Sequence, residues 1–151
     1  MIGAFLFGCF CMDQILYWEH RMSHSKCLHY LCKLHINRHH RTYPRDLSST
    51  SVVDTTWIPS IYDINASILI PGVIIPLQIY STFNTITWAI IHGAFQSMVL
   101  AFALHTFAHT YPNLCPSWYR NFHRGHHAIR TTNFGVLTPV PDIMFGTFSS
   151  G

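Results

Sequence analysis

The chain has 151 residues, of which 49% are hydrophobic, 15% aromatic and only 10% charged. An ordinary soluble domain carries about 25% charged residues, so the composition argues against one and predicts a single membrane domain over residues 1–151. The net charge of +3 is small and no basic stripe alternates with aromatic residues, so we expect no nucleic-acid partner.

The first stretch, residues 1–18, is apolar except for Asp13. It lacks the basic start and the small-residue cleavage site of a signal peptide. We therefore expect the closing part of a membrane helix, which reaches water near Tyr17 and Trp18. A carboxylate at the depth of Asp13 is unfavourable unless it is paired. Asp13 is predicted either to orient a metal-binding histidine or to be a capping or interfacial residue.

The stretch from residue 20 to residue 40 contains six histidines. If it forms one straight helix, His29 points away from the others, and His40 joins them only if the helix frays before Pro44. The remaining four then share one stripe about 100° wide: His20, His24, His35 and His39.

Two apolar segments follow a polar loop that extends to Trp57. Ser60–Tyr80 is interrupted by prolines, which predicts a kinked or re-entrant membrane helix. Thr85–Leu104 contains no charged residue and is the best candidate for a full membrane span. The two segments are expected to form a hairpin. His92 is expected to face away from the later histidines and to bond to a neighbouring helix.

Two further histidine clusters follow the second apolar segment. His105 and His109 are spaced i,i+4 at its end, before prolines at 112 and 116 break the helix. A second cluster is spaced i, i+3, i+4 and so lies on one side of a later helix: His123, His126 and His127. The Gly- and Pro-containing tail, residues 131–151, is expected to be a loop that folds back over these side chains.

The histidine spacing predicts a metal site. A histidine separated by two or three residues from a His-His pair has about 0.15 expected chance occurrences in this chain, yet it occurs twice, at residues 35–40 and 123–127. Imidazole binds Fe, Zn, Cu and Ni well, and one structural zinc needs only four ligands. Nine or ten histidines therefore favour two ions. The alternative is a set of separately bonded histidines that form a pH-sensitive belt at a membrane surface.

The same residues resemble the histidine boxes of the fatty acid hydroxylase/sterol desaturase superfamily. The run Asp13-x-x-x-Tyr17-Trp18-x-His20-Arg21-x-x-His24 resembles the first box, HINRHH at 35–40 the second and HRGHH at 123–127 the last. His109 resembles the extra histidine that precedes the last box. The closing signature of the superfamily is matched at seven positions: Asn133, Phe134, Gly135, Asp142, Phe145, Gly146 and Thr147. Pro141 replaces the usual tryptophan.

The resemblance implies an all-α integral membrane helical bundle whose histidine-rich metal site faces the cytosol. The membrane is that of the endoplasmic reticulum in a eukaryote or the inner membrane in a bacterium. The implied cofactors are two Fe ions, which Zn can replace in a purified sample, together with O₂ and electrons from a cytochrome b5/reductase-type donor. The implied monooxygenase activity is hydroxylation or desaturation of a C–H bond in a lipid, either a fatty acyl chain or a sterol.

Ten histidines are the predicted metal ligands: His20, His24, His35, His39, His40, His105, His109, His123, His126 and His127. For His105 the sequence leaves both outcomes open, a ligand or a neighbour of the ligands. Asp13 and Asp142 are the carboxylates predicted to act in the catalytic site by orienting these ligands. Superfamily members usually carry further spans before the first box, so the chain is expected to be N-terminally short. The alternative to an enzyme is a non-catalytic or truncated membrane metal-binding paralogue.

Overall fold

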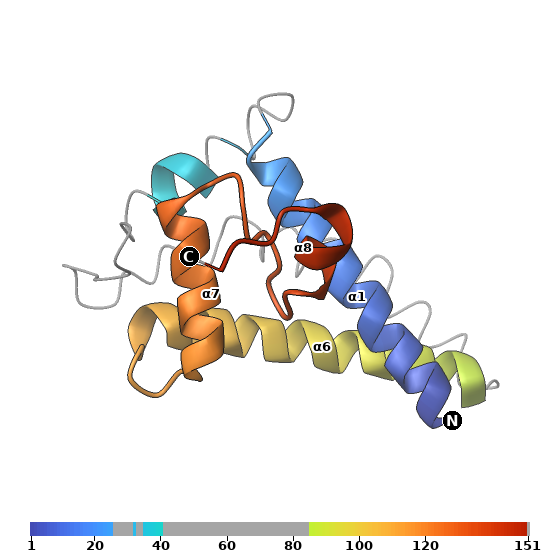
Figure 1. Ribbon diagram of the computed structural model, residues 1–151. Coiled ribbons are helices and arrows are strands. Elements are labelled where there is room, and N and C mark those ends of the chain that lie inside the picture. The colour runs from blue at the N-terminus through green and yellow to red at the C-terminus, as the bar shows by residue number, and fades with distance from the viewer. Residues whose placement is uncertain (26–31, 33–34, 41–84, 151) are drawn as a thin grey trace.

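The structure, a computed structural model, describes residues 1–25, 32, 35–40 and 85–150. These residues form helices and no strand, so the all-α prediction is confirmed for them (Figure 1). The elements are α1 (Ile2–Ser23), the π-helical turn η1 (His35–His39), α6 (Thr85–Thr110), α7 (Ser117–Ala128) and α8 (Val140–Phe145). The predicted loop before Trp57 and the predicted membrane segment Ser60–Tyr80 lie outside the described residues.

Helix α6 contains the predicted membrane span. Within the described residues, its stretch Thr85–His109 is the one helix long and apolar enough to cross a membrane. Only 28% of its most apolar window is buried inside the protein, whereas the core helix of a soluble protein would be mostly covered. Phe95, Leu100 and Phe107 are among the apolar side chains that it exposes. This surface favours association with a membrane.

Helices α1 and α6 cross in direct backbone contact. A Cβ atom added at Gly8 would lie 1.9 Å from the carbonyl oxygen of Ile90, and one at Gly93 would lie 2.1 Å from that of Phe5. The Cys9 thiol donates a hydrogen bond to the Gly93 carbonyl at 3.4 Å. Glycine is therefore required at both positions for the helices to approach this closely. Beyond the crossing the two helices diverge (Figure 1).

We expect Gly93→Ala to lower the free energy of unfolding by about 1–3 kcal/mol, because an added methyl group must displace the backbone of α1. Thermal unfolding in detergent measures this loss. Gly3→Ala is the matched control, since nothing lies within 4 Å of a Cβ at that position of the same helix pair. Alanine is preferred to glycine inside a helix, so the control should keep or slightly raise the melting temperature. Equal melting temperatures for the two variants would contradict the close crossing.

The tail joins α1 and α6 in one small core. The buried members of this core come from α1, α6 and residues 136–137: Met12, Leu16, Met98, Ala101, Val136 and Leu137. The Tyr119 hydroxyl of α7 donates a hydrogen bond to the Val136 carbonyl at 2.7 Å. The predicted folding back of the tail is thus confirmed. The tail was expected to be a loop throughout, however, and it contains the short helix α8, which ends at Gly146 in a left-handed conformation with φ 68°.

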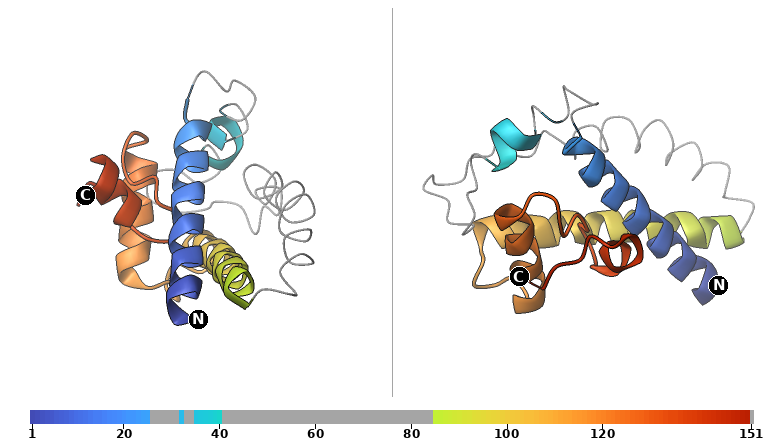
Figure 2. Two further views of the ribbon diagram at one scale, coloured as in Figure 1. Left: turned by 90° about the vertical axis from the view of Figure 1, so that its right-hand side faces the viewer. Right: turned by 45° about the horizontal axis from the view of Figure 1, so that its top comes forward.

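Helix α7 lies across the end of α6 (Figure 2). The chain leaves α6 at Thr110 and enters α7 at Ser117, so the break predicted from the prolines at 112 and 116 is confirmed. Cys115 and Tyr119 pack on Ala108 of α6 in a second buried cluster. This packing brings the histidine-bearing face of α7 to the end of the candidate span.

The single straight helix predicted over residues 20–40 is wrong. Helix α1 ends at Ser23, whose hydroxyl donates a hydrogen bond to the His20 carbonyl at 2.6 Å. A serine that bonds to its own helix in this way competes with regular backbone hydrogen bonding and favours a helix end. His35–His39 form the separate π-helical turn η1. The histidines of this region therefore reach the site from two elements that are not coaxial (Figure 1).

Candidate metal centre

Nine of the ten predicted ligands form two groups where the ends of α1, α6 and α7 meet η1. Within each group, one ring nitrogen of every histidine lies within 4.8 Å of the others. The first group is His20, His24, His35, His40 and His126, and the second group is His39, His109, His123 and His127. All are buried except His24, which is partly exposed. The two groups adjoin, since the rings of His40 and His127 have centroids 4.4 Å apart.

The Nε2 atoms of the first group converge on one point. The Nε2 atom of His40 lies 3.2 Å from the Nε2 atoms of His24, His35 and His126. An imidazole nitrogen carries at most one hydrogen, so these contacts cannot all be hydrogen bonds. At the usual metal–nitrogen distance of about 2.0–2.1 Å, two nitrogens that bind one ion at 90–110° lie about 2.9–3.4 Å apart. The observed spacing therefore fits lone pairs that share one cation.

Two backbone carbonyls of the tail orient rings of the first group. The Nδ1 atom of His20 lies 2.7 Å from the Phe134 oxygen, and Nδ1 of His126 lies 2.7 Å from the Thr132 oxygen. A carbonyl oxygen only accepts hydrogen bonds, so Nδ1 carries the hydrogen in both rings and Nε2 offers its lone pair to the centre. The sequence could not predict the role of these two carbonyls, because a backbone group is present in every residue type.

The π-helical winding of η1 explains why His40 belongs to the first group. In a π-helix, residues five apart are hydrogen-bonded neighbours, and His35 and His40 are five apart, with Nε2 atoms at 3.2 Å. The intervening His39 points to the second group. The predicted stripe, which was based on ordinary α-helical spacing, had placed His39 with His35 and had left His40 outside.

The second group combines η1, α6 and α7. The Nε2 atoms of His109 and His123 lie 2.8 Å apart, and the His39 ring lies with its centroid 4.8 Å from that of His109. His105 is adjacent, with ring centroids 4.5 Å from His123 and 5.0 Å from His39. Its nitrogens nevertheless fall outside the cluster of four. His105 is thus placed beside the second group.

If each histidine group holds one metal ion, His109→Ala should remove one ion per chain and His105→Ala should remove none. The reason is that His109 contributes a nitrogen to the second group, whereas His105 contributes packing beside it. Metal analysis of the two purified variants after identical loading with Fe(II) measures the difference. Loss of an ion from the His105→Ala protein would show that this ring is a fifth ligand of the second group.

Burial keeps the imidazoles neutral. It lowers the pKa of His20 to about 4 from 6.5, although the hydrogen bond to the Phe134 carbonyl acts in the opposite direction. Burial, then the nearby His20, lowers the pKa of His24 to about 2. Burial also holds the pKa of five further rings well below its ordinary value: His35, His39, His40, His123 and His126. Neutral imidazole is the form that binds a metal ion.

Asp142 supports the first group through the backbone that it holds. Its side chain is fully buried and accepts hydrogen bonds from the backbone N–H groups of Phe134 and Gly135 at 2.7 and 2.6 Å. It also accepts one from the Thr147 hydroxyl at 2.6 Å. The carbonyl of this same Phe134 orients His20. Asp142 thus acts on the predicted ligand His20 indirectly, through the peptide group that joins Phe134 and Gly135.

Two residues of the first histidine box, Tyr17 and Arg21, are connected to the Asp142 carboxylate by hydrogen bonds through the Thr147 hydroxyl. The Thr147 hydroxyl donates to Asp142 and lies 3.0 Å from the Tyr17 hydroxyl, which must therefore donate to Thr147. Arg21 in turn donates to the Tyr17 oxygen at 2.9 Å. A relay of hydrogen bonds connects Arg21, Tyr17 and Thr147 to Asp142.

Asp13 has a different partner from the predicted histidine. Its two carboxylate oxygens accept hydrogen bonds from the backbone N–H and the hydroxyl of Thr138. Asp13 is 5% exposed and connects α1 to the turn that precedes α8. The structure thus gives it a role in attaching the tail to α1, and the tail carbonyls have the orienting role predicted for Asp13.

The comparison with protein families identifies the chain. Its residues 5–147 match the family described as fatty acid hydroxylase. The chain belongs to the fatty acid hydroxylase family. The resemblance found in the histidine boxes is thereby confirmed. Searches of the curated proteins and of the solved structures each gave no significant match.

Membership of the fatty acid hydroxylase family indicates a lipid-modifying oxidoreductase that associates with a membrane. The two histidine groups are compatible with the metal site that such an enzyme needs. Both ends of the matched region contribute to the candidate metal centre, since α1 supplies His20 and the tail supplies the carbonyl that orients it.

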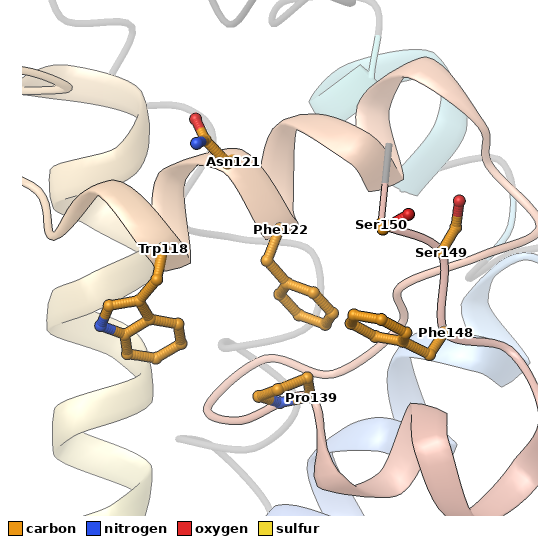
Figure 3. A pocket seen from close by; sticks show the side chains of 7 residues that line it. All are labelled: Trp118, Asn121, Phe122, Pro139, Phe148, Ser149 and Ser150. Atoms are coloured by element: carbon orange, nitrogen blue, oxygen red, sulfur yellow. The ribbon is translucent and has the colours of Figure 1, made fainter.

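A separate pocket of about 260 Å³ lies between α7 and the end of the tail (Figure 3). Its walls are Trp118, Asn121, Phe122, Pro139, Phe148, Ser149 and Ser150. None of these is a predicted site residue, and none is ionisable. The pocket is therefore not part of the candidate metal centre.

Proposed function

We propose that this protein is a membrane monooxygenase that holds two iron ions and uses O₂ to hydroxylate, or to desaturate, a C–H bond of a fatty acyl chain or a sterol. The observation that carries the proposal is the pair of adjoining, buried histidine groups, whose donor nitrogens lie within 4.8 Å of one another in each group. Bound iron supplies the activation of O₂ that oxidation of an unreactive C–H bond requires.

The chain's own residues would hold and shield this centre. The five rings of the first group and the four of the second supply neutral nitrogens, and the Phe134 and Thr132 carbonyls keep the hydrogens of His20 and His126 on Nδ1. Burial of nearly all the rings excludes water from the ligands. Asp142 acts as a positioning residue, because it fixes the peptide that orients His20.

We also propose that residues 1–151 act as one domain in the endoplasmic reticulum membrane of a eukaryote or the inner membrane of a bacterium. His109 lies at the last residue of the candidate span, which supports a metal centre at one face of the membrane. We assign that face to the cytosol, where a cytochrome b5/reductase-type protein would deliver electrons.

The test is oxygen incorporation into lipid. Membranes that contain the protein and a matching reductase system are exposed to ¹⁸O₂, and their lipids are analysed by mass spectrometry for a hydroxylated or desaturated product. Removal of metal with a chelator should abolish the product, and Fe(II), but not Zn(II), should restore it. Two bound irons without any lipid product would contradict the enzyme and favour the non-catalytic metal-binding alternative.

A further inference from the structure

Helix α8 presents an uncharged, apolar surface to its surroundings. Its one charged side chain, Asp142, is fully buried against the tail backbone. The outward side chains Val140, Ile143, Met144 and Phe145 are exposed to 43%, 62%, 55% and 40%. An amphipathic element of a soluble protein turns its charged side outward, and here the arrangement is reversed. Contiguous exposed apolar side chains indicate a binding surface.

This surface continues onto α1. The rings of Trp18 and Phe145 make an edge contact with centroids 5.0 Å apart, and the Gln14 amide lies 4.0 Å from the Met144 sulfur. Trp18 is itself 42% exposed. Helix α1 crosses the candidate span α6 in direct contact (Figure 2), so the apolar surface of α8 is continuous with a helix that packs on the candidate span.

The edge of this surface has the composition of a membrane–water boundary. The Arg21 guanidinium lies over the Trp18 ring, 5.2 Å from its centroid, and over the Tyr17 ring at 5.9 Å. Tryptophan and tyrosine concentrate at the level of the lipid headgroups, and an arginine there places its charge toward headgroup phosphates while its stem remains in an apolar environment.

We infer that α8 lies in the membrane–water boundary region of the bilayer. The contact with lipid is made by a lipid-facing patch of five side chains: Trp18, Val140, Ile143, Met144 and Phe145. A helix of six residues is too short to cross a membrane, so α8 lies within one leaflet beside the candidate metal centre. The inference depends on membrane association through α6 and is independent of the proposed oxidation chemistry, so either can fail alone.

The experiment measures the surroundings of α8 directly. The five cysteines are replaced by alanine or serine, Ile143→Cys is introduced and labelled with a nitroxide, and the protein is reconstituted in phosphatidylcholine vesicles. Electron paramagnetic resonance then compares collisions with O₂, which dissolves in lipid, and with a water-soluble nickel chelate. Two reference labels are placed at exposed positions: Val99→Cys on α6 and Arg124→Cys on α7. Met144→Cys provides a second position on α8.

We expect the oxygen-to-nickel ratio at 143 and 144 to match that at 99 and to exceed that at 124 several-fold. A ratio at 143 and 144 equal to that at 124 would overturn the inference, because the patch would then face water. Low accessibility to both reagents would also overturn it, because another protein surface, such as a second copy of this chain, would then cover the patch.

Discussion

Replacing His126 by alanine should reduce the bound iron from two ions per chain to one and abolish lipid oxidation. The Nε2 atom of His126 lies 3.1 and 3.2 Å from those of His24 and His40, so its removal takes a donor from the centre of the first group. We expect the loss of activity to exceed the roughly 10–100-fold that results from changing a residue behind a metal ligand. Metal analysis and product formation are measured on the same preparation.

His92→Ala is the matched control for this variant. His92 is also a histidine of the apolar region, but it stacks on Trp88, with ring centroids 4.7 Å apart, and belongs to neither group. Both ions and the activity should persist after its replacement. If His126→Ala retained two ions, the assignment of the first group as a metal site would be wrong. If His92→Ala lost one, the metal would bind elsewhere.

Asp142→Ala should lower the free energy of unfolding by about 2–6 kcal/mol, because each buried donor left without a partner costs about 1–3 kcal/mol. The two backbone donors are the N–H groups of Phe134 and Gly135, whereas the Thr147 hydroxyl can rotate toward another acceptor. Asp142→Asn should not restore the loss, since one oxygen is replaced by an NH₂ group that faces another donor. Thermal unfolding in detergent, together with iron content, measures the effect, and iron should be lost first from the group that contains His20.

Asp13→Asn is the contrasting variant. The partner of Asp13 is Thr138, which contacts it through one backbone N–H and one hydroxyl. An asparagine oxygen can accept from the N–H, and its NH₂ group can donate to the hydroxyl, which is able to reverse its role. We expect a small change in melting temperature. Similar large losses for Asp142→Asn and Asp13→Asn would contradict the different roles given to the two carboxylates.

The parts of the centre that lie on regular helices could be predicted from the sequence. The charge-free run before His105 defines α6, and the spacing of His123, His126 and His127 places them on one side of α7. In these cases side-chain direction follows from the helical repeat. The proline at 112 marked the break between the two helices for a similarly local reason.

The parts that depend on irregular backbone could not be predicted. The end of α1 at Ser23 and the π-helical winding of η1 assign the neighbours His39 and His40 to different groups. A serine also occurs inside helices, so Ser23 alone does not mark the end, and no residue type specifies a π-helical turn. The orienting groups behind His20 and His126 are carbonyls, whose position depends on how the tail folds. Asp142 was recognised by its position in a motif, but its contact with the Phe134 and Gly135 amides depends on tertiary structure.

The distance along the chain between the partners of the first group has a consequence for biosynthesis. His24 and His126 are 102 residues apart, and His20 is 114 residues from the carbonyl that orients it. Chains fold from the N-terminus as they are synthesised, so α1 is made and can fold long before α7 and the tail exist. The first group therefore cannot close until His126 and Phe134 have been synthesised, and a metal ion can bind to the complete group only after that point. A messenger truncated before the codon for Phe134 would yield a protein whose first histidine group lacks the hydrogen-bond acceptor for His20.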